Sequence, residues 1–237
     1  MDTIVTDPPF FDNVHYSQLA DFFHVWQRHI LGENGEVNPA STRSPQEVQN
    51  GDAAVFTERL LGVWQECHRV LKADGLLIFT YHHSRPEGWS SMLEAVVRGG
   101  FVVVAAHPVK AEMSVASPKH QAKEPIDLDI ILACRKRGTV ESGPPNLASL
   151  VDDAVADASL QVARFNANGR RLSRNDVRVV LTANIVKVLS WHPSVDEAIA
   201  FLGSAQSHIE QAIDSVHDRQ DVGECAPKAT NGQLALW

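Results

Sequence analysis

The chain has few cysteines, and none of them are paired in the sequence. Cys67, Cys134 and Cys225 stand far apart among 237 residues, with no CxxC spacing and no accompanying HExxH motif. Neither a zinc site nor a disulfide framework is indicated, and we expect no bound metal and a reducing, cytoplasmic location.

Long apolar runs and an excess of basic residues are also missing. No apolar run approaches the roughly 20 residues that cross a bilayer, and no signal-peptide pattern opens the chain, so we expect no membrane association. The formal net charge is −8. Because phosphate contacts need Lys and Arg, this charge counts against a free-standing nucleic-acid binder and requires a local basic cluster for any such contact.

What the first 140 residues do contain is an alternation of strand-like and helix-like segments. Apolar runs predict strands over 3–6, 76–83, 101–109 and 128–136. Helical spacing predicts helices over 16–31 and 53–72, and from Pro86 to the Gly99-Gly100 pair. The alternation implies parallel pairing of the first three strands, and the last two strands are expected to form an antiparallel hairpin. The sequence therefore predicts an α/β domain over 1–140.

A second region follows the SGPP stretch at 142–145. Periodic apolar residues predict helices over 147–166, 174–189 and 195–216, which gives a helical region over 146–217. The polar tail over 218–237 is expected to be disordered. The stretches 32–51 and 110–127 show no periodicity and are expected to be long loops.

The first strand ends in the tetrapeptide Asp7-Pro8-Pro9-Phe10. Open α/β sheets bind ligands at the carboxyl ends of their strands. The Asp7 carboxylate and the rigid carbonyl before Pro8 can accept two hydrogen bonds from an exocyclic amine, which leaves the nitrogen lone pair directed at an electrophile. Phe10 offers a flat face for an extruded base. Such a site acts by positioning and electrostatics, without a covalent intermediate.

This tetrapeptide resembles the Asp/Asn/Ser-Pro-Pro-aromatic motif of S-adenosylmethionine-dependent amino-methyltransferases, which methylate adenine N6 or cytosine N4 in DNA. The longer stretch VTDPPFFDNVHYSQLADFFHVW resembles adenine-specific DNA methylases whose full-length members also carry a zinc ribbon. ECHRVLKADGLLIFTYHH, HPVKAEMS and DIILACRK resemble the same family in the same order, so the resemblance covers about residues 2–137.

The resemblance implies a partial Rossmann-like class I methyltransferase sheet, its strands four to seven with the last one antiparallel, followed by a helical C-terminal region. It implies S-adenosylmethionine as cofactor, DNA as partner, and adenine N6 in preference to cytosine N4. The catalytic residues it implies are Asp7, Pro8, Pro9 and Phe10. A methyltransferase acting on RNA or on a protein amide, and a non-catalytic scaffold, remain the alternatives.

Two further sets of residues are candidates for binding. Residues after the motif and at the end of the second strand are expected near the substrate: Phe11, Asn13, His15, Tyr16, His82 and His83. The alternative is that they form a turn, a helix start and a polar surface. Arginines around a helix start, which Ser173 can cap, are expected to contact DNA phosphates unless they only form a solvated face: Arg170, Arg171, Arg174 and Arg178. The loops 32–51 and 110–127 are candidate target-recognition elements.

One element implied by the resemblance is missing. Family members bind S-adenosylmethionine through an earlier strand that ends in a Gly-rich loop, and no such segment precedes Asp2. VVRGGF is expected to stop a helix, and AFLGSAQ to lie inside one. We therefore expect the chain to be a catalytic half that is inactive alone, with the cofactor-binding half supplied by a second polypeptide or a missing N-terminal segment.

Overall fold

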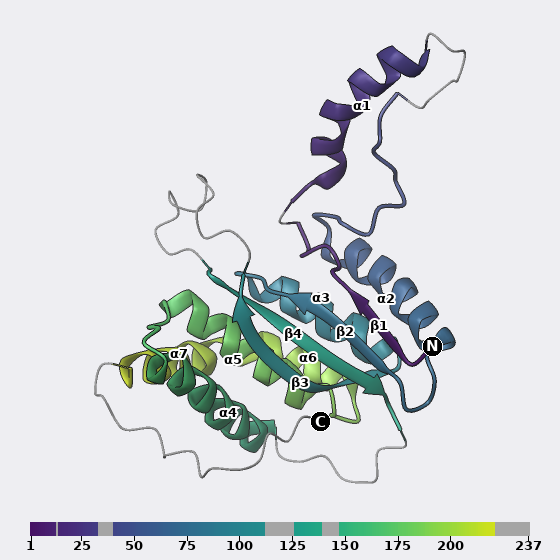
Figure 1. Cartoon of the computed structure of the whole chain (residues 1–237). Helices are drawn as coiled ribbons and strands as arrows, with labels where there is room; N and C mark the ends of the chain where they lie inside the picture. The colour runs from purple at the N-terminus through teal and green to yellow at the C-terminus, as the bar shows by residue number, and fades with distance from the viewer. Residues whose placement is uncertain (13, 33–39, 112–125, 139–146, 221–237) are drawn as a thin grey trace.

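The computed structural model describes residues 1–12, 14–32, 40–111, 126–138 and 147–220 (Figure 1). In chain order the elements are β1 (Thr3–Thr6), α1 (Tyr16–Gly32), α2 (Ala53–Val70), β2 (Leu76–Tyr81), α3 (Pro86–Arg98), β3 (Phe101–Lys110), β4 (Leu128–Lys136), α4 (Leu147–Ala167), α5 (Arg174–Leu189), α6 (Val195–Ser204) and α7 (Gln206–Asp218). None of these helices combines the length and the hydropathy that crossing a membrane requires.

The four strands form one mixed sheet in the order β1-β2-β4-β3. β1 pairs parallel with β2, and β4 runs antiparallel to both of its neighbours. The predicted α/β class and the β3–β4 hairpin are confirmed. The expectation that the first three strands pair side by side is wrong for the third, because β4 lies between β2 and β3. Leu128, Ile130 and Leu132 of β4 are fully buried, which suits a central strand.

The two faces of the sheet are covered to different extents. On one face Leu77, Phe79 and Tyr81 of β2 are fully buried, and Trp64 of α2 stacks on Phe79 with ring centroids 4.9 Å apart. The other face carries Val5, whose side chain is 74% exposed, beside residues of β2 and β4 that are only half-buried. Among the described residues, no element covers this face at β1.

The two edges of the sheet are also covered to different extents. At the β3 edge, the Ser190 hydroxyl accepts a bond from the Val103 amide (2.8 Å), and Trp191 Nε1 donates to the Val103 carbonyl (2.9 Å). Gln161 Nε2 of α4 donates to the Ala106 carbonyl (2.8 Å). The helical region therefore covers this edge. Nothing in the described chain pairs with the outer edge of β1, and an open strand edge is a site for association.

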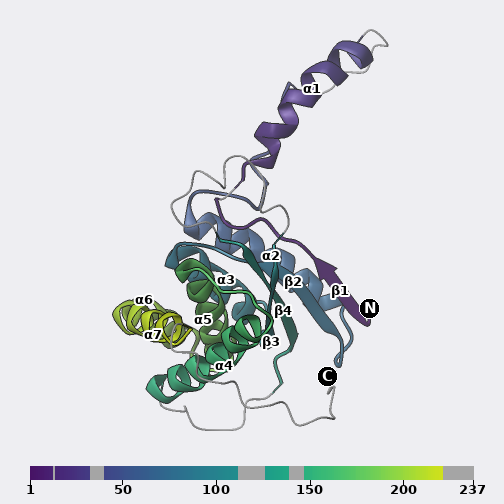
Figure 2. The same cartoon turned by 60° about the vertical axis from the view of Figure 1, so that its left-hand side comes forward.

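The C-terminal helices pack against α3 and β3 (Figure 2). α5 begins and ends where the sequence predicts, with a capping box between Ser173 and Asp176. The single helix expected over 195–216 is instead two helices, α6 and α7, which meet at Ala205. Ala205 is buried, and its backbone leaves the helical conformation at φ −82° and ψ 8°. The tail over 221–237 lies outside the described residues.

α1 differs most from what its sequence suggests. Its helical spacing is confirmed, but Leu19, Phe23 and Trp26, whose pattern favours packing in the core, are 60–65% exposed. The helix projects away from the body in both views (Figures 1 and 2). Trp64 of α2 and Trp89 of α3, by contrast, are buried.

Two glycines in helices provide a matched test of the packing. A Cβ added at Gly88 of α3 would lie 2.6 Å from Cγ of His83, whereas at Gly62 of α2 it would meet nothing within 4 Å. We expect Gly88→Ala to lower the free energy of unfolding by about 1–3 kcal/mol through overpacking. Gly62→Ala should raise it by about 0.5–1 kcal/mol through helix propensity. Urea unfolding measures both, and a Gly88→Ala variant as stable as the parent would contradict the packing around His83.

Candidate functional site

Asp7 lies at the carboxyl end of β1, where the parallel pairing brings it beside β2. Thr6 is opposite Phe79 in the register, so Asp7 follows directly beside Thr80. The Thr80 hydroxyl donates a hydrogen bond to Asp7 Oδ1. Pro8 is buried, and its ring fixes the backbone behind the carboxylate. The exposed Asp7 side chain is thus held by one bond and still faces solvent.

The two phenylalanines of the motif point in different directions. Phe10 is half-buried and meets the edges of the Tyr81 and His82 rings at centroid distances of 5.4 and 4.9 Å. Phe11 is buried against Phe56 and His83. Phe11 was expected to contact substrate, but its side chain lies in the core.

The backbone at Phe11 explains this separation. Its φ is 54°, in the left-handed region that an aromatic residue rarely adopts. Such a conformation costs about 1–3 kcal/mol and persists only where the surroundings impose it. Here the turn sends one ring into the core while the preceding ring stays against Tyr81 and His82.

His82 is held by a carboxylate on the neighbouring strand. Its Nδ1 is hydrogen-bonded to Oδ1 of Asp129, which lies on β4. An ionised carboxylate only accepts, so in this bond Nδ1 carries the proton. The bond fixes the orientation of the ring against Phe10.

These groups line one cavity of about 1240 Å³. The motif contributes Asp7, Pro8, Pro9 and Phe10. The sheet contributes Thr80, Lys110 and Asp129, and His82 follows directly after β2. The start of α1 and the loop before α2 contribute Tyr16, Glu47, Val48 and Gln49. Pockets for single small molecules measure roughly 300–1,000 Å³. The cavity is therefore larger than a typical pocket for one small molecule.

Residues 47–49 belong to the loop that was expected to help recognise the target. Glu47 is fixed by the Ser44 amide, which donates to its carboxylate (2.9 Å), and by Arg59, which donates to its carbonyl. Nε2 of Gln49 is buried and has no hydrogen-bond partner among the described residues. An unpaired buried donor is unfavourable by about 1–3 kcal/mol, so a ligand with an acceptor would stabilise this wall.

Of the other residues expected near the substrate, some line the Asp7 cavity and others do not. Tyr16 lines the cavity, whereas His15 is exposed outside its lining. Asn13 lies outside the described residues. His83 is buried on the far side of the motif, where its Nδ1 accepts a bond from the Arg85 amide (3.0 Å) and its Nε2 lies 3.6 Å from Asp12. Burial lowers the pKa of His83.

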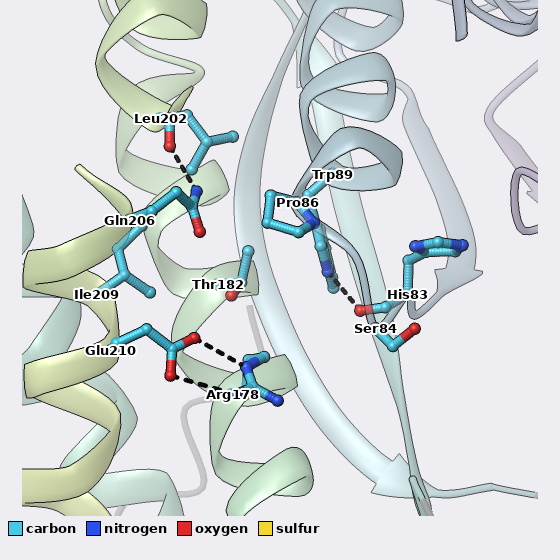
Figure 3. A pocket seen from close by; sticks show the side chains of 10 residues that line it. All are labelled: His83, Ser84, Pro86, Trp89, Arg178, Thr182, Leu202, Gln206, Ile209 and Glu210. Carbon is cyan, nitrogen blue, oxygen red and sulfur yellow. Dashed lines mark hydrogen bonds and ion pairs between the residues drawn. The ribbon is translucent and has the colours of Figure 1, made fainter. Parts of the chain in front are cut away.

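His83 instead lines a second cavity, of about 250 Å³, between α3 and the helical region (Figure 3). Trp89 and Pro86 form one wall, and Thr182 and Glu210 lie on the opposite side. This cavity is separate from the one that contains Asp7, because the two share no lining residue.

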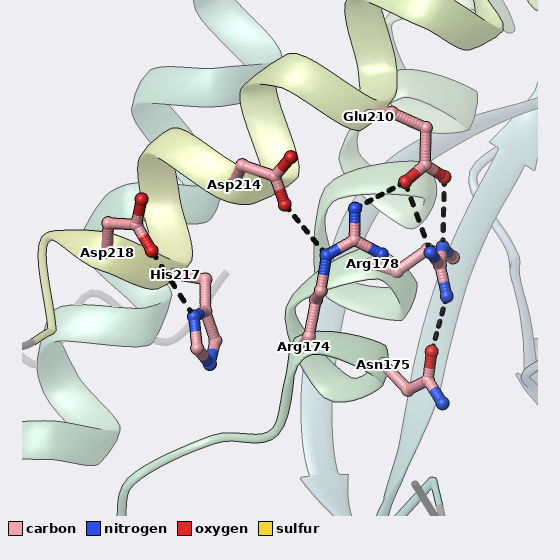
Figure 4. Close-up of polar contacts among 7 residues, drawn as sticks. All are labelled: Arg174, Asn175, Arg178, Glu210, Asp214, His217 and Asp218. Carbon is pink, nitrogen blue, oxygen red and sulfur yellow. Dashed lines mark hydrogen bonds and ion pairs between the residues drawn. The ribbon is translucent and has the colours of Figure 1, made fainter.

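The arginines expected to contact DNA are engaged within the chain. Arg174 bonds to Asp214 (2.7 Å) and to Glu210 (2.7 Å), and Arg178 bonds to Glu210 (3.2 Å), as Figure 4 shows. The hydrogen bonds that Arg174 donates to Asp214 and Glu210 raise the pKa of its guanidinium. These ion pairs join α5 to α7, and DNA phosphates would have to compete with them.

The other two arginines of the cluster precede α5. Arg170 reaches the Asp127 carbonyl (3.4 Å) and lies over the Phe165 ring at 5.7 Å. Arg171 is exposed between α4 and α5. None of the four arginines lines the Asp7 cavity.

Thr80 and Asp129 of the cavity wall were not expected from the sequence, whereas Lys110 and Gln49 were expected only as members of the candidate recognition loops 110–127 and 32–51. Asp129 could have been expected at the site, because it is a charged residue in an otherwise apolar strand. The alternation of side chains in a strand places it on the same face of the sheet as the polar end of β2. Thr80 required the register of β1 against β2. Gln49 carried no local signal, since it lies in a stretch without periodicity.

No protein-family model matches the chain, and no curated protein or solved structure matches it either. Among the described residues, no group of three or more His, Cys, Asp or Glu side chains is placed to hold a metal ion.

The loop that includes the wall residues 47–49 is bonded to α1 through a carboxylate that titrates at low pH. Asp21 of α1 accepts bonds from the Thr42 amide (2.6 Å), the Thr42 hydroxyl (2.6 Å) and the Ser41 hydroxyl (2.7 Å). The two bonds from Thr42, followed by that from Ser41, lower the pKa of Asp21 to about 2.

We therefore expect the amide proton of Thr42 to report this titration. Because the folded pKa is depressed, the contribution of Asp21 to stability is complete above its ordinary pKa of 3.8 and is lost as the pH falls through about 2. The amide proton shift of Thr42, followed by NMR, should change with a midpoint near 2 and stay flat in Asp21→Asn. A midpoint at the ordinary value would show that these bonds are absent in solution.

Proposed function

We propose that the Asp7 cavity is the amine-binding site of an S-adenosylmethionine-dependent DNA methyltransferase that acts on adenine N6. The observation that carries the proposal is the arrangement at the end of β1: a carboxylate held by Thr80, a backbone carbonyl fixed by Pro8, and the Phe10 ring beside them. The last strand of the sheet runs antiparallel, as the sequence resemblance implies for strands four to seven of a methyltransferase sheet.

The residues of this chain position the amine. The Asp7 carboxylate and the carbonyl before Pro8 accept its two N–H bonds, so that its lone pair points into the cavity. Phe10 stacks on the base after it leaves the duplex. The hydrogen bond from Thr80 keeps the Asp7 carboxylate in place, which saves reorganisation at the moment of transfer.

S-adenosylmethionine supplies a methyl group on a positively charged sulfonium. The carboxylates of Asp7, Glu47 and Asp129 line the cavity and suit that positive charge. For the nucleoside end of the cofactor, the described residues of the cavity offer no Gly-rich turn with backbone donors. This chain therefore fits the methyl-donating end of the cofactor and leaves its other end to further residues.

The open edge of β1 is where we place those residues. A parallel strand added beside β1 would continue the sheet, and a helix behind that strand would cover Val5 on the bare face. We propose that a second polypeptide, or a segment before residue 1, provides this strand and the cofactor-binding loop. The choice of DNA over RNA or a protein amide, and of adenine N6 over cytosine N4, rests on the sequence resemblance alone.

A methyl-transfer assay tests this proposal. The chain alone should transfer no label from S-adenosylmethionine, and the chain combined with the product of its neighbouring reading frame should label DNA rather than RNA or protein. Asp7→Ala in the active combination should reduce the rate by about 10²–10³-fold, as removal of one preorganised polar group does in other enzymes.

The matched control is Asp74→Ala, which removes an exposed carboxylate in the turn before β2. Its rate should equal that of the parent, and both variants should unfold at the same urea concentration as the parent. An Asp7→Ala variant that is folded and fully active would exclude the proposed role of Asp7. If only RNA or only protein were labelled, DNA would not be the substrate.

A further inference from the structure

In the part of the chain that the structure describes, α1 presents a continuous apolar stripe that is largely exposed. Tyr16, Leu19, Phe22, Phe23, Trp26 and Ile30 are each 60–65% exposed. All six lie on one side of the helix, because their spacing follows its period of 3.6 residues. Soluble proteins rarely expose an apolar surface of this kind unless it binds something.

The opposite side of α1 is already bound by the same chain. The Ser17 carbonyl accepts a bond from Thr42 Oγ1 (2.9 Å), Asp21 accepts from Ser41 and Thr42, and Arg28 donates to the Ala40 carbonyl (3.4 Å). Residues 40–42 therefore return along the polar side of the helix. These bonds hold the polar side of α1 against residues 40–42, so the apolar stripe lies on the other side of the helix, and only Tyr16 at its start also lines the Asp7 cavity.

The spacing of the stripe indicates what kind of surface covers it. Tyr16, Leu19, Phe23, Trp26 and Ile30 are separated by three, four, three and four residues. This is the heptad pattern by which one helix packs along another. Helices that lie on a membrane surface carry Lys and Arg along the polar side, whereas the polar side here carries Ser17, Asp21 and Arg28.

Two features favour a second copy of this chain as the source of that helix. The positions that flank the heptad residues are occupied by Ala20, Phe22, Gln27 and His29, so two identical helices bring no carboxylate pairs or Lys/Arg pairs together at the seam. α1 also stands clear of the body in both views, which leaves room for an identical helix along the stripe (Figures 1 and 2).

The available area suits a weak dimer. If each of the six side chains buries roughly 100 Å², the interface removes about 600 Å² per copy and about 1,200 Å² in total. That is the lower limit of the range for stable protein interfaces, where weak and transient complexes are found.

We propose that the chain self-associates through α1, with the apolar stripes of two copies packed against each other as a pair of helices. This contact is separate from the open edge of β1, and it does not depend on the proposed methyltransferase activity.

Sedimentation equilibrium of the full chain, from low to high micromolar concentration, tests the proposal. The parent chain should change from monomer to dimer over this range. Phe23→Glu, which places a charge in the centre of the stripe, should raise the dissociation constant by roughly tenfold or more. Because Phe23 is exposed in the single chain, the variant should have the same circular dichroism spectrum and the same urea midpoint as the parent.

Two matched controls add one negative charge elsewhere. Gln18→Glu lies on α1 outside the stripe, and Val5→Glu lies on the open edge of β1; both should leave the dissociation constant within about twofold of the parent value. A parent chain that stays monomeric would overturn the proposal. So would a Phe23→Glu variant that dimerises like the parent, or a dimer that only Val5→Glu dissociates.

Discussion

The parallel pairing of β1 with β2 determines where the groups of the candidate site lie. Four residue pairs, from Thr3–Leu76 to Thr6–Phe79, fix the register. That register brings Asp7 to Thr80, places Phe10 against Tyr81 and His82, and leaves the proline pair to end β1 at the rim of the cavity. A shift of one residue would turn the side chains of β1 to the opposite faces and separate Asp7 from Thr80.

One edge strand of this sheet, β3, is covered by other parts of the chain, whereas the other, β1, has no described neighbour on its outer side. At β3, three side chains from α4 and the segment after α5 form hydrogen bonds with the outer backbone edge of the strand. Buried residues lie on both faces of this strand. At β1 the outer backbone edge has no neighbour in the described chain, and Val5 is exposed. The candidate site lies at this open end. If the proposed cofactor-binding strand adds there, assembly of the sheet and completion of the site would be one event, and a partner would be required for activity.

The apolar stripe of α1 is a second open surface, and it differs in kind from the edge of β1. A strand edge offers backbone donors and acceptors, whereas the stripe offers only side chains at helical spacing. The polar side of α1 is fastened to residues 40–42, and the same loop continues into the wall formed by residues 47–49. The position of α1 and the shape of the candidate site are therefore linked through one loop.

Much of the local structure could be predicted from the sequence, because periodic apolar residues and punctuating residues define it. The start of α3 at Pro86 and both ends of α5 are examples. The position of Asp7 and Phe10 at a strand end also followed from the sequence, since Pro8 and Pro9 cannot continue a ladder.

What could not be predicted depends on contacts between distant segments. The central place of β4 was not predictable, because the hairpin can join the sheet through either strand. Phe10 and Phe11 carry the same side chain, and only the left-handed backbone at Phe11 separates the cavity residue from the core residue. The pattern of α1 defines an apolar face but does not say whether the same chain covers it. Thr80 and Asp129 become part of the site only through strand register.

Binding of a nucleobase to this chain tests the proposed amine site without a partner, because the groups proposed to hold the amine are all present in the chain. We would titrate the isotopically labelled chain with 2′-deoxyadenosine and follow its NMR spectrum. Shift changes should centre on the Phe10 ring, the Thr80 amide and the His82 ring, and they should be lost in Asp7→Ala. A spectrum that does not change, or changes that persist without the Asp7 carboxylate, would contradict it.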